Sequence, residues 1–270
     1  MRSVPELRGF QVGLQNWRGP GFNIVVLSDL HVVAPWSSLR HMARIVETVN
    51  AMSPDLVILA GDYLGERKIP GRLASAPEIA AVLAELRAGL GVFAILGNHD
   101  WKDCAQAKAN GYESCAMMDA LAGTPVTLLQ NQARAIEIGG HPLWLVGLDS
   151  QRPVPTDPGR GLHRPDTAFA PVPEGAAAIL LAHEPAYFGR GDTRAGLQIS
   201  GHTHGGQLNL FGWRPLVALR SDARFAHGLI EDGPRRLVIS SGLGFSGVPL
   251  RIGQPPEITR IDIAPEPDAT

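Results

Sequence analysis

Residues 92–100 read VFAILGNHD, an apolar run that ends at a glycine and continues as three polar residues. A continuous apolar run of this length is typical of a strand buried on both faces, as in a sheet covered by helices. The same arrangement occurs five more times. The apolar run at 22–27 leads into Ser28-Asp29-Leu30-His31, the run at 56–60 into Gly61-Asp62, and the run at 143–148 into Asp149. The run at 177–182 leads into His183, and the run at 197–200 into Gly201-His202-Thr203-His204. These strand ends, rich in Asp, Asn and His, predict one polar site built from several loops.

Helical patterns separate some of the predicted strands. Apolar residues repeat at helical spacing over 39–52, and Pro54 closes that helix. A second helix is predicted over 77–86, with Gly89 near its end. Strand–helix–strand units imply parallel strands with right-handed crossovers, and ligands of such sheets bind at the carboxyl ends of the strands. We therefore expect the polar strand ends to meet at one edge of a sheet.

The second half of the chain predicts more strands. Residues 135–138 and 142–148 flank Gly139-Gly140 and predict a hairpin, and later runs at 225–230, 236–240 and 258–263 predict a mixed second sheet. The Pro-rich segment 151–175 predicts an irregular loop, which is either a lid or substrate wall or a plain surface excursion. Because no repeat or linker divides the chain, we expect one α/β domain over residues 1–270, with a core from about residue 10 to about residue 263.

The composition excludes several classes of protein. The net charge is −2 without a cluster of Lys and Arg, so no nucleic-acid partner is expected. No apolar run reaches the ~18 to 20 residues that span a bilayer, and no apolar signal core follows Arg2. We therefore expect no transmembrane segment and a cytoplasmic protein, with peripheral membrane association left open. Cys104 and Cys115 are expected to be reduced thiols, with a redox clip or an extra metal site as the alternative.

Histidine is concentrated at the predicted strand ends. Five of the nine histidines lie there, together with Asp29, Asp62 and Asn98: they are His31, His99, His183, His202 and His204. A protein rarely gathers so many polar groups at the ends of buried strands without a cation to satisfy them. Nitrogen and oxygen ligands without thiolate suit Mn, Fe, Zn or Ni, whereas a Mg²⁺ or Ca²⁺ site would show more carboxylates and less imidazole.

These motifs resemble those of a known family. Asp29-x-His31, Gly61-Asp62, Gly97-Asn98-His99-Asp100, His183 and Gly201-His202-x-His204 follow the order of the five motifs of the calcineurin-like metallophosphoesterase superfamily. Residues 201–207 (GHTHGGQ), 241–247 and 255–258 further resemble the bacterial YaeI/YkuE-type phosphodiesterase branch. The resemblance covers about residues 10–263. It implies a four-layer sandwich of two mixed β-sheets flanked by helices, two divalent metal ions, and hydrolysis of a phosphate ester by a hydroxide that bridges the ions.

The resemblance also implies a set of metal ligands. One ion would take Asp29, His31, Asp62 and His204, and the other would take Asp62, Asn98, His183 and His202. Asp62 would then bridge two ions about 3.5 to 4 Å apart. The physical logic is independent of the family, because a bridging carboxylate offsets part of the repulsion between two dications. Neutral imidazoles in the other positions leave net positive charge to attract a phosphate.

The resemblance gives His99 a catalytic role, in which it protonates the leaving oxygen or stabilises charge on the phosphoryl group. Asp100 is expected to orient His99, with a helix cap as the alternative.

Other candidates have two interpretations each. Asp149 is either a hydrogen-bond partner of a ligand imidazole or a turn residue, and His227 is expected to be structural. Arg220 and Arg224 either contact the phosphate or are solvated. Four apolar residues after the His99 motif form either a cap for a lipid-like substrate or part of the core. They are Trp101, Tyr112, Met117 and Met118.

The leading hypothesis is a dinuclear metal-dependent phosphohydrolase, more specifically a phosphodiesterase, that acts on a small-molecule or lipid-like phosphate ester. The first alternative is a scaffold that keeps the fold, has lost the chemistry and binds protein partners. The second is a passive metal-binding protein. A degenerate scaffold should have lost ligands, whereas all seven ligand positions are filled here. A passive metal binder would have no need of His99.

Overall fold

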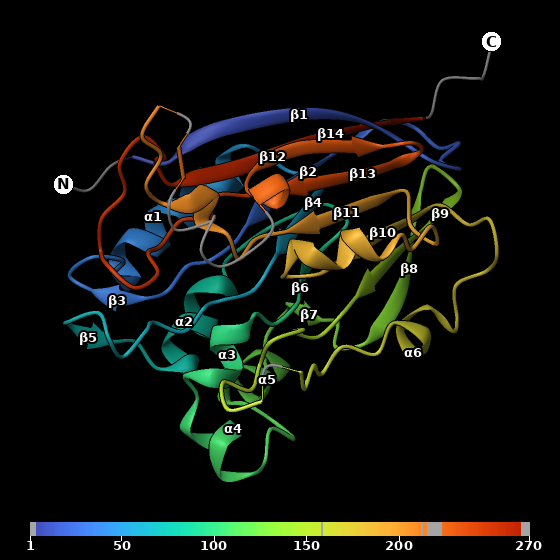
Figure 1. Ribbon diagram of the computed structural model, residues 1–270. Coiled ribbons are helices and arrows are strands. Elements are labelled where there is room, and N and C mark those ends of the chain that lie inside the picture. Colours follow the sequence, from blue (N-terminus) through green and yellow to red (C-terminus); the bar gives the residue numbers. More distant parts are fainter. Residues whose placement is uncertain (1–3, 158, 212, 215–222, 266–270) are drawn as a thin grey trace.

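The computed structural model describes residues 4–157, 159–211, 213–214 and 223–265 (Figure 1). Arg220, one of the two arginines considered for phosphate binding, lies outside the described residues.

Two six-stranded sheets form the centre of the fold. The first has the strand order β1 (Glu6–Leu14), β14 (Glu257–Pro265), β2 (Phe22–Leu27), β4 (Leu56–Leu59), β6 (Val92–Ala94) and β7 (Thr127–Leu128). The second has the order β12 (Gly228–Asp232), β13 (Arg235–Ile239), β11 (Leu197–Ser200), β10 (Ala178–Leu181), β9 (His141–Gly147) and β8 (Gln132–Ile138). A small separate pair joins β3 (Val33–Ala34) to β5 (Arg72–Leu73). Both large sheets are mixed. In the first sheet, β2, β4, β6 and β7 run parallel to one another, and β14 runs antiparallel to β2. In the second sheet, the edge strands β12 and β8 run antiparallel to their neighbours β13 and β9.

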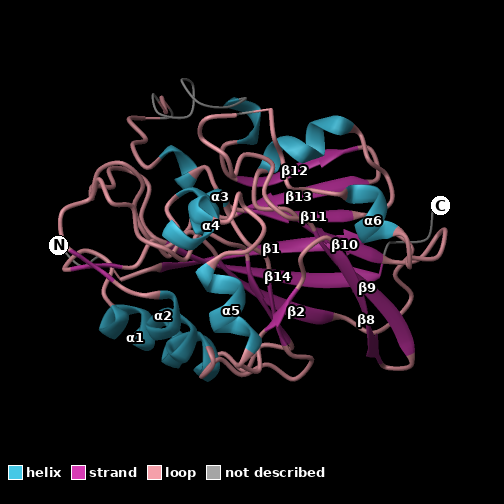
Figure 2. Ribbon diagram, turned by 90° about the horizontal axis from the view of Figure 1, so that it is seen from below, coloured by secondary structure: helices cyan, strands magenta, loops and turns pink. Residues whose placement is uncertain are grey.

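Helices cover the outer faces of the sheets (Figure 2). They are α1 (Leu39–Ala51), α2 (Ala76–Leu83), α3 (Asn98–Lys102), α4 (Ala105–Ala109), α5 (Ala116–Ala122) and α6 (Pro165–Phe169), with the 3-10 turns η1 (Pro185–Arg190), η2 (His204–Gly206) and η3 (Ala223–Phe225). Ser38 begins α1 by accepting a hydrogen bond from the backbone of His41. Ser75 and Glu78 form a capping box at α2.

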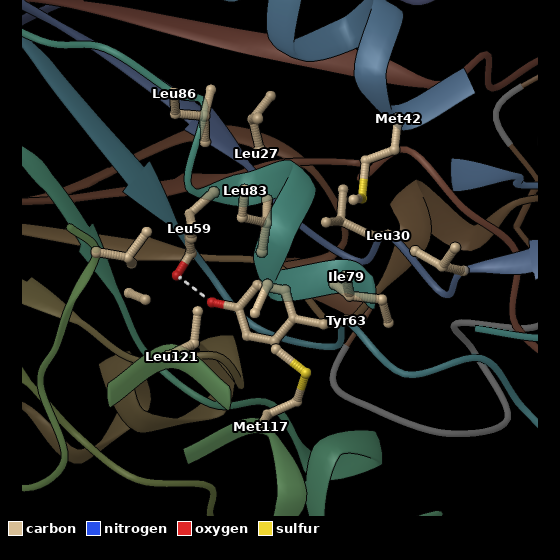
Figure 3. Packing of buried hydrophobic residues seen from close by; sticks show 14 of the residues in the cluster. Leu27, Leu30, Met42, Leu59, Tyr63, Ile79, Leu83, Leu86, Met117 and Leu121 are labelled. Atoms are coloured by element: carbon tan, nitrogen blue, oxygen red, sulfur yellow. Dashed lines mark hydrogen bonds between the residues drawn. The ribbon is translucent and has the colours of Figure 1, made fainter. Parts of the chain in front are cut away.

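The cores show why the central strands are apolar throughout. On β2, Ile24 and Val26 face the core between the two sheets, while Val25 and Leu27 face the core under α1, α2 and α5. In this outer core the hydroxyl of Tyr63 donates to the backbone oxygen of Leu59 at 3.0 Å (Figure 3). A third cluster lies under α6 and η1 on the far side of the second sheet. Helix, sheet, sheet and helix layers give the four-layer sandwich that the sequence led us to expect.

The structure confirms the hairpin, which consists of β8 and β9, and it corrects three expectations. The strand expected over 225–230 starts at Gly228, because residues 223–225 form a 3-10 turn. The run at 258–263 belongs to the first sheet rather than the second, since β14 inserts between β1 and β2. There Ile261 and Ile263 bury their side chains in the core between the sheets. The segment 151–175 is not irregular throughout, because α6 packs on β8 and β9.

Candidate metal centre

The predicted ligands converge from both sheets. Parallel strands β2, β4 and β6 end at the same edge of the first sheet, and Asp29, Asp62 and Asn98 follow these ends. Parallel strands β10 and β11 of the second sheet end in His183 and in the loop that carries His202. The two sets meet directly, because the backbone N of His202 donates to the Oδ2 of Asp29 at 3.0 Å. The expectation of one site at the strand ends is met by this geometry.

The backbone at these strand ends is held in an unusual conformation. Five of the seven predicted ligands have a left-handed backbone, with positive φ: Asp29 (52°), His31 (39°), Asp62 (59°), His202 (73°) and His204 (54°). L residues rarely adopt this conformation, and its concentration at one place is typical of functional sites. The left-handed residues turn the chain sharply at each strand end and direct side chains from both sheets toward one another.

Two glycines make room for the acidic side chains. A Cβ on Gly97 would overlap the carboxylate of Asp62, and a Cβ on Gly201 would overlap the hydroxyl of Ser28 and approach the carboxylate of Asp29 to 2.5 Å. The backbone φ of Gly97 is −97°, which any residue adopts, so space rather than conformation requires a glycine there. These contacts explain why Gly precedes the Asn98 and His202 motifs.

The ligands form two adjoining clusters. Asp29, His31 and His204 make up the first, with donor atoms that all lie within 4.8 Å of one another. Asp62, His183 and His202 make up the second, within the same limit. All of these side chains are buried except that of His202, which is partly exposed.

Asp62 lies between the two clusters. Its Oδ2 is 3.6 Å from the Nε2 of His31 in the first cluster and 3.1 Å from the Nε2 of His183 in the second. Asn98 joins the second cluster, because its Oδ1 lies 2.9 Å from the Nδ1 of His202. Asp62 therefore lies within reach of donor atoms in both clusters, and the division of the seven residues between two ions stays a prediction.

His183 provides a test of whether this site fits a cation. Its Nδ1 lies 2.7 Å from the backbone oxygen of Ala60 and must donate, because a carbonyl only accepts. Its Nε2 is buried and has no hydrogen-bond partner among the residues the structure describes. In the neutral ring this Nε2 would present a lone pair to the carboxylate of Asp62, which is unfavourable unless a cation or a proton lies between them.

The pKa shifts agree with a cation site. Burial lowers the pKa of His202 and His204 well below the usual value and lowers that of His31 to about 4. These imidazoles are therefore neutral at neutral pH and have a lone pair for a metal ion. His183 differs: burial lowers its pKa, but the neighbouring carboxylates of Asp62, Asp29 and Glu184 together outweigh burial, and the net shift is upward. These neutral imidazoles and the carboxylates beside them fit a site for divalent cations.

His99 has two carboxylate neighbours that the sequence motifs did not indicate. Its Nδ1 lies 2.6 Å from the Oδ2 of Asp103, and its Nε2 lies 3.3 Å from the Oε1 of Glu66. Burial raises the pKa of Glu66, but His99, a hydrogen bond with Ser246 and more distant cationic groups together outweigh burial, and the net shift is downward. Asp103 stands four residues after His99 at the end of a helix, a spacing that could have suggested the contact. Glu66 has no such local signal.

Asp100 does not orient His99 in this arrangement. Its carboxylate accepts hydrogen bonds from the backbone N of Asp62 (2.9 Å), Tyr63 (2.8 Å), Leu64 (3.1 Å) and Gly97 (2.9 Å). Asp100 therefore caps its own helix at Gly97, the alternative considered from the sequence, and also holds the turn that carries Asp62. Asp103 takes the place expected for Asp100 beside His99.

Other candidates have structural surroundings. Asp149 accepts from the Nε1 of Trp101 and the Nε2 of Gln130, both at 2.8 Å, rather than from a ligand imidazole. His227 lies 2.6 Å from the carboxylate of Glu257, and Arg224 is exposed beside Phe225.

The apolar residues after the His99 motif belong to the core rather than to a cap. Trp101 and Met117 are fully buried there, and Tyr112 and Met118 are partly buried and pack against this core. Cys104 and Cys115 are buried free thiols.

Comparison with known proteins agrees with this geometry. The profile of the calcineurin-like phosphoesterase family matches residues 22–206, so the chain belongs to this family. The uncharacterized metallophosphoesterase YkuE of Bacillus subtilis is 28% identical over 243 residues, which is 88% of this chain and 78% of that protein. An uncharacterized metallophosphoesterase of Campylobacter jejuni is 32% identical over 268 residues, covering 96% of this chain and 63% of the relative.

A longer relative comes from Danio rerio. It is named as a transmembrane protein with a metallophosphoesterase domain and is 32% identical over 251 residues, or 89% of this chain. The chain spans about half of that protein, 53% of its length. Within the described part of this chain, no helix has both the length and the apolar character needed to cross a bilayer.

Proposed function

We propose that this protein is a dinuclear metal-dependent phosphodiesterase. The observation that carries the proposal is the position of Asp62, whose carboxylate lies between two clusters of buried imidazoles and carboxylates. Asp29, His31, Asp62 and His204 would hold one ion, and Asp62, Asn98, His183 and His202 the other. When bound, two divalent ions supply Lewis acidity to the phosphoryl oxygens and a nucleophile derived from water. Mn, Fe, Zn or Ni suits these nitrogen and oxygen donors.

His99 would protonate the leaving oxygen. The ring adjoins the ligand clusters, since its centroid lies 4.7 Å from that of His31. Asp103 accepts from Nδ1 and fixes the ring plane, so a proton carried on Nε2 has a defined direction. Because His31, Asp62 and His99 also have donor atoms within 4.8 Å of one another, a role of His99 as a ligand is the alternative that mutagenesis must exclude.

The preference for a diester rests on the cations near the site. A monoester dianion needs cationic groups around its free oxygens. Of the arginines considered for that role, Arg224 is exposed beside Phe225. Arg251 reaches the site, but its Nη2 donates to the backbone oxygen of Ser241 at 2.8 Å. A diester has one negative charge and therefore needs fewer such cations, and an acid such as His99 can assist the departure of its leaving oxygen.

A small-molecule or lipid-like diester remains the proposed substrate, with no nucleic acid, and a cytoplasmic location remains part of the proposal. The test is kcat/KM for bis(p-nitrophenyl) phosphate and for p-nitrophenyl phosphate with added Mn²⁺ at one pH. We expect faster cleavage of the diester. A clear preference for the monoester would contradict the diesterase assignment alone. Absence of hydrolysis with each of the four candidate metals would instead favour the scaffold.

A further inference from the structure

Exposed apolar side chains gather at one end of the molecule. Among the described residues, ten large hydrophobic side chains are exposed, and eight of them come from four loops: Trp36, Leu73, Leu210, Phe211, Trp213, Val248, Leu250 and Ile252. Single exposed apolar residues are normal, but a contiguous group of them marks an interaction site. We call these four loops the rim, which comprises the described residues 33–37, 64–73, 207–211 with 213–214, and 245–253.

Hydrogen bonds show that the rim is continuous. The Nε1 of Trp36 donates to the backbone oxygen of Pro70 at 2.8 Å, which joins the first loop to the second. The backbone N of Gly247 donates to the Oε2 of Glu66 at 3.2 Å, which joins the second loop to the fourth. In Figure 1, β3 and β5 of the first two loops lie at the left end of the molecule.

The third and fourth loops run side by side. The backbone N of Asn209 donates to the oxygen of Ile252 at 2.8 Å, and the backbone N of Ile252 donates to the oxygen of Gln207 at 3.0 Å. Phe211 and Trp213 lie at the tip of the third loop, where the two residues are 109% and 63% exposed to solvent. These two aromatic residues are the most prominent apolar groups of the rim.

The rim borders the metal centre. Glu66 of the second loop contacts His99, and the third loop begins three residues after His204. Arg251 of the fourth loop has its Nη2 3.3 Å from the Nδ1 of His204. Whatever covers the rim therefore lies next to the proposed site of hydrolysis.

The charge of the rim is opposite to that of the whole chain. The chain has a net charge of −2, but the rim contains five cationic residues and one acidic residue. The cations are Arg67, Lys68, Arg72, Arg214 and Arg251. The single acid, Glu66, is only 6% exposed and is turned toward His99. Arg72 pairs with Glu78 outside the rim, and Arg251 is turned inward toward His204, so the exposed cations of the rim are chiefly Arg67 and Lys68.

We propose that the rim docks on the surface of a membrane that contains anionic lipids. Aromatic and aliphatic side chains enter the boundary between headgroups and acyl chains, and neighbouring Lys and Arg attract anionic headgroups. The rim offers both groups on one continuous surface. A second copy of this chain fits less well, because a symmetric contact would bring the same cations face to face. Docking would hold the metal centre close to the headgroups, and it does not depend on which phosphate ester is hydrolysed.

Vesicle flotation of the full chain tests the proposal. We expect the wild-type protein to bind vesicles of phosphatidylcholine with phosphatidylglycerol more strongly than vesicles of phosphatidylcholine alone. Phe211→Ser with Trp213→Ser should weaken binding to the anionic vesicles at least about tenfold. Arg67→Glu with Lys68→Glu should weaken it by a similar factor, and added salt should weaken wild-type binding. The matched control is Lys108→Glu with Arg134→Glu, which makes the same charge change at exposed positions outside the rim and should bind as the wild type does.

Two results would overturn the proposal: a wild-type protein that does not bind anionic vesicles, or a control that loses as much binding as the rim variants. Sedimentation velocity provides a further check. A wild-type dimer that dissociates in the Phe211→Ser, Trp213→Ser variant would show that the rim is covered by a second copy instead. Hydrolysis of a soluble diester by the same variants separates the two proposals, because we expect it to be unchanged by loss of membrane binding.

Discussion

The Nδ1 of His99 lies 2.6 Å from the Oδ2 of Asp103, four residues further along the chain. The two residues span α3, so the helix itself sets their separation. On the opposite side of the ring, Glu66 arrives from a loop of the first sheet. The proposed proton donor is therefore positioned by one local and one distant carboxylate.

The first prediction separates the proton donor from the metal ligands. His99→Gln should retain both metal ions and lower kcat by about 10² to 10⁴, the range for a removed general acid. Asp103→Asn should also retain the metals and lower kcat by about 10- to 100-fold, with little change in KM, because only the orientation of the ring is lost. Metal analysis and steady-state kinetics measure both. A parallel loss of metal and activity in His99→Gln would identify His99 as a ligand.

The second prediction concerns the shared carboxylate. Asp62→Asn should reduce the occupancy of both metal positions, because Asp62 adjoins both clusters, whereas Asn98→Ala should weaken mainly the position shared with His202. Metal content per chain after dialysis distinguishes the two variants. Equal losses in both would mean that Asp62 is not shared.

The third prediction concerns the space beside Asp62. Gly97→Ala should displace the carboxylate of Asp62, because the added Cβ would overlap it, and should destabilise the protein by about 1 to 3 kcal/mol as other overpacked substitutions do. Metal content should fall with it. Gly89→Ala is the matched control, since the nearest atom to its Cβ would be the backbone oxygen of Asp55 at 3.9 Å. Denaturant titration and metal analysis provide the comparison, and equal behaviour of the two variants would remove the steric argument.

The fourth prediction is a pH dependence of stability that arises at Asp149. Burial raises the pKa of this carboxyl from 3.8 to about 6. Because the pKa of Asp149 is higher in the folded protein than in the unfolded chain, protonation of this carboxyl stabilises the folded state. This contribution is complete below the unfolded pKa of 3.8 and is lost as the pH rises toward the folded pKa of about 6. Relative to Asp149→Asn, the wild-type protein should therefore lose up to about 3 kcal/mol of unfolding free energy between pH 4 and pH 7, at 1.36 kcal/mol per pKa unit.

Denaturant titrations of both proteins at several pH values measure this difference. Other titrating groups cancel because only the difference between the two proteins is used. A gap between wild type and variant that is constant with pH would contradict the shift.

The amino-acid sequence by itself determined the central strands, the hairpin and the polar side chains of the candidate metal centre. These features are local, because an apolar run buried on both faces and the polar residues that follow it are adjacent in the chain. The family resemblance added the grouping of the proposed ligands around Asp62, which stays a prediction, and the fold brings these residues close together.

Other features depend on contacts between distant parts of the chain, and only the tertiary structure decided them. The strand at 257–265 could have joined either sheet, and its hydrogen bonds to β1 and β2 place it in the first. Glu66 meets His99 across 33 residues, and no local pattern marks it. From the sequence, the carboxylate of Asp100 could contact either His99 or the turn after β4. In the folded chain it accepts hydrogen bonds from four backbone N–H groups, three of them in that turn and one at Gly97. The rim likewise exists only because four loops, each unremarkable in sequence, are brought to the same end of the molecule by the packing of the two sheets.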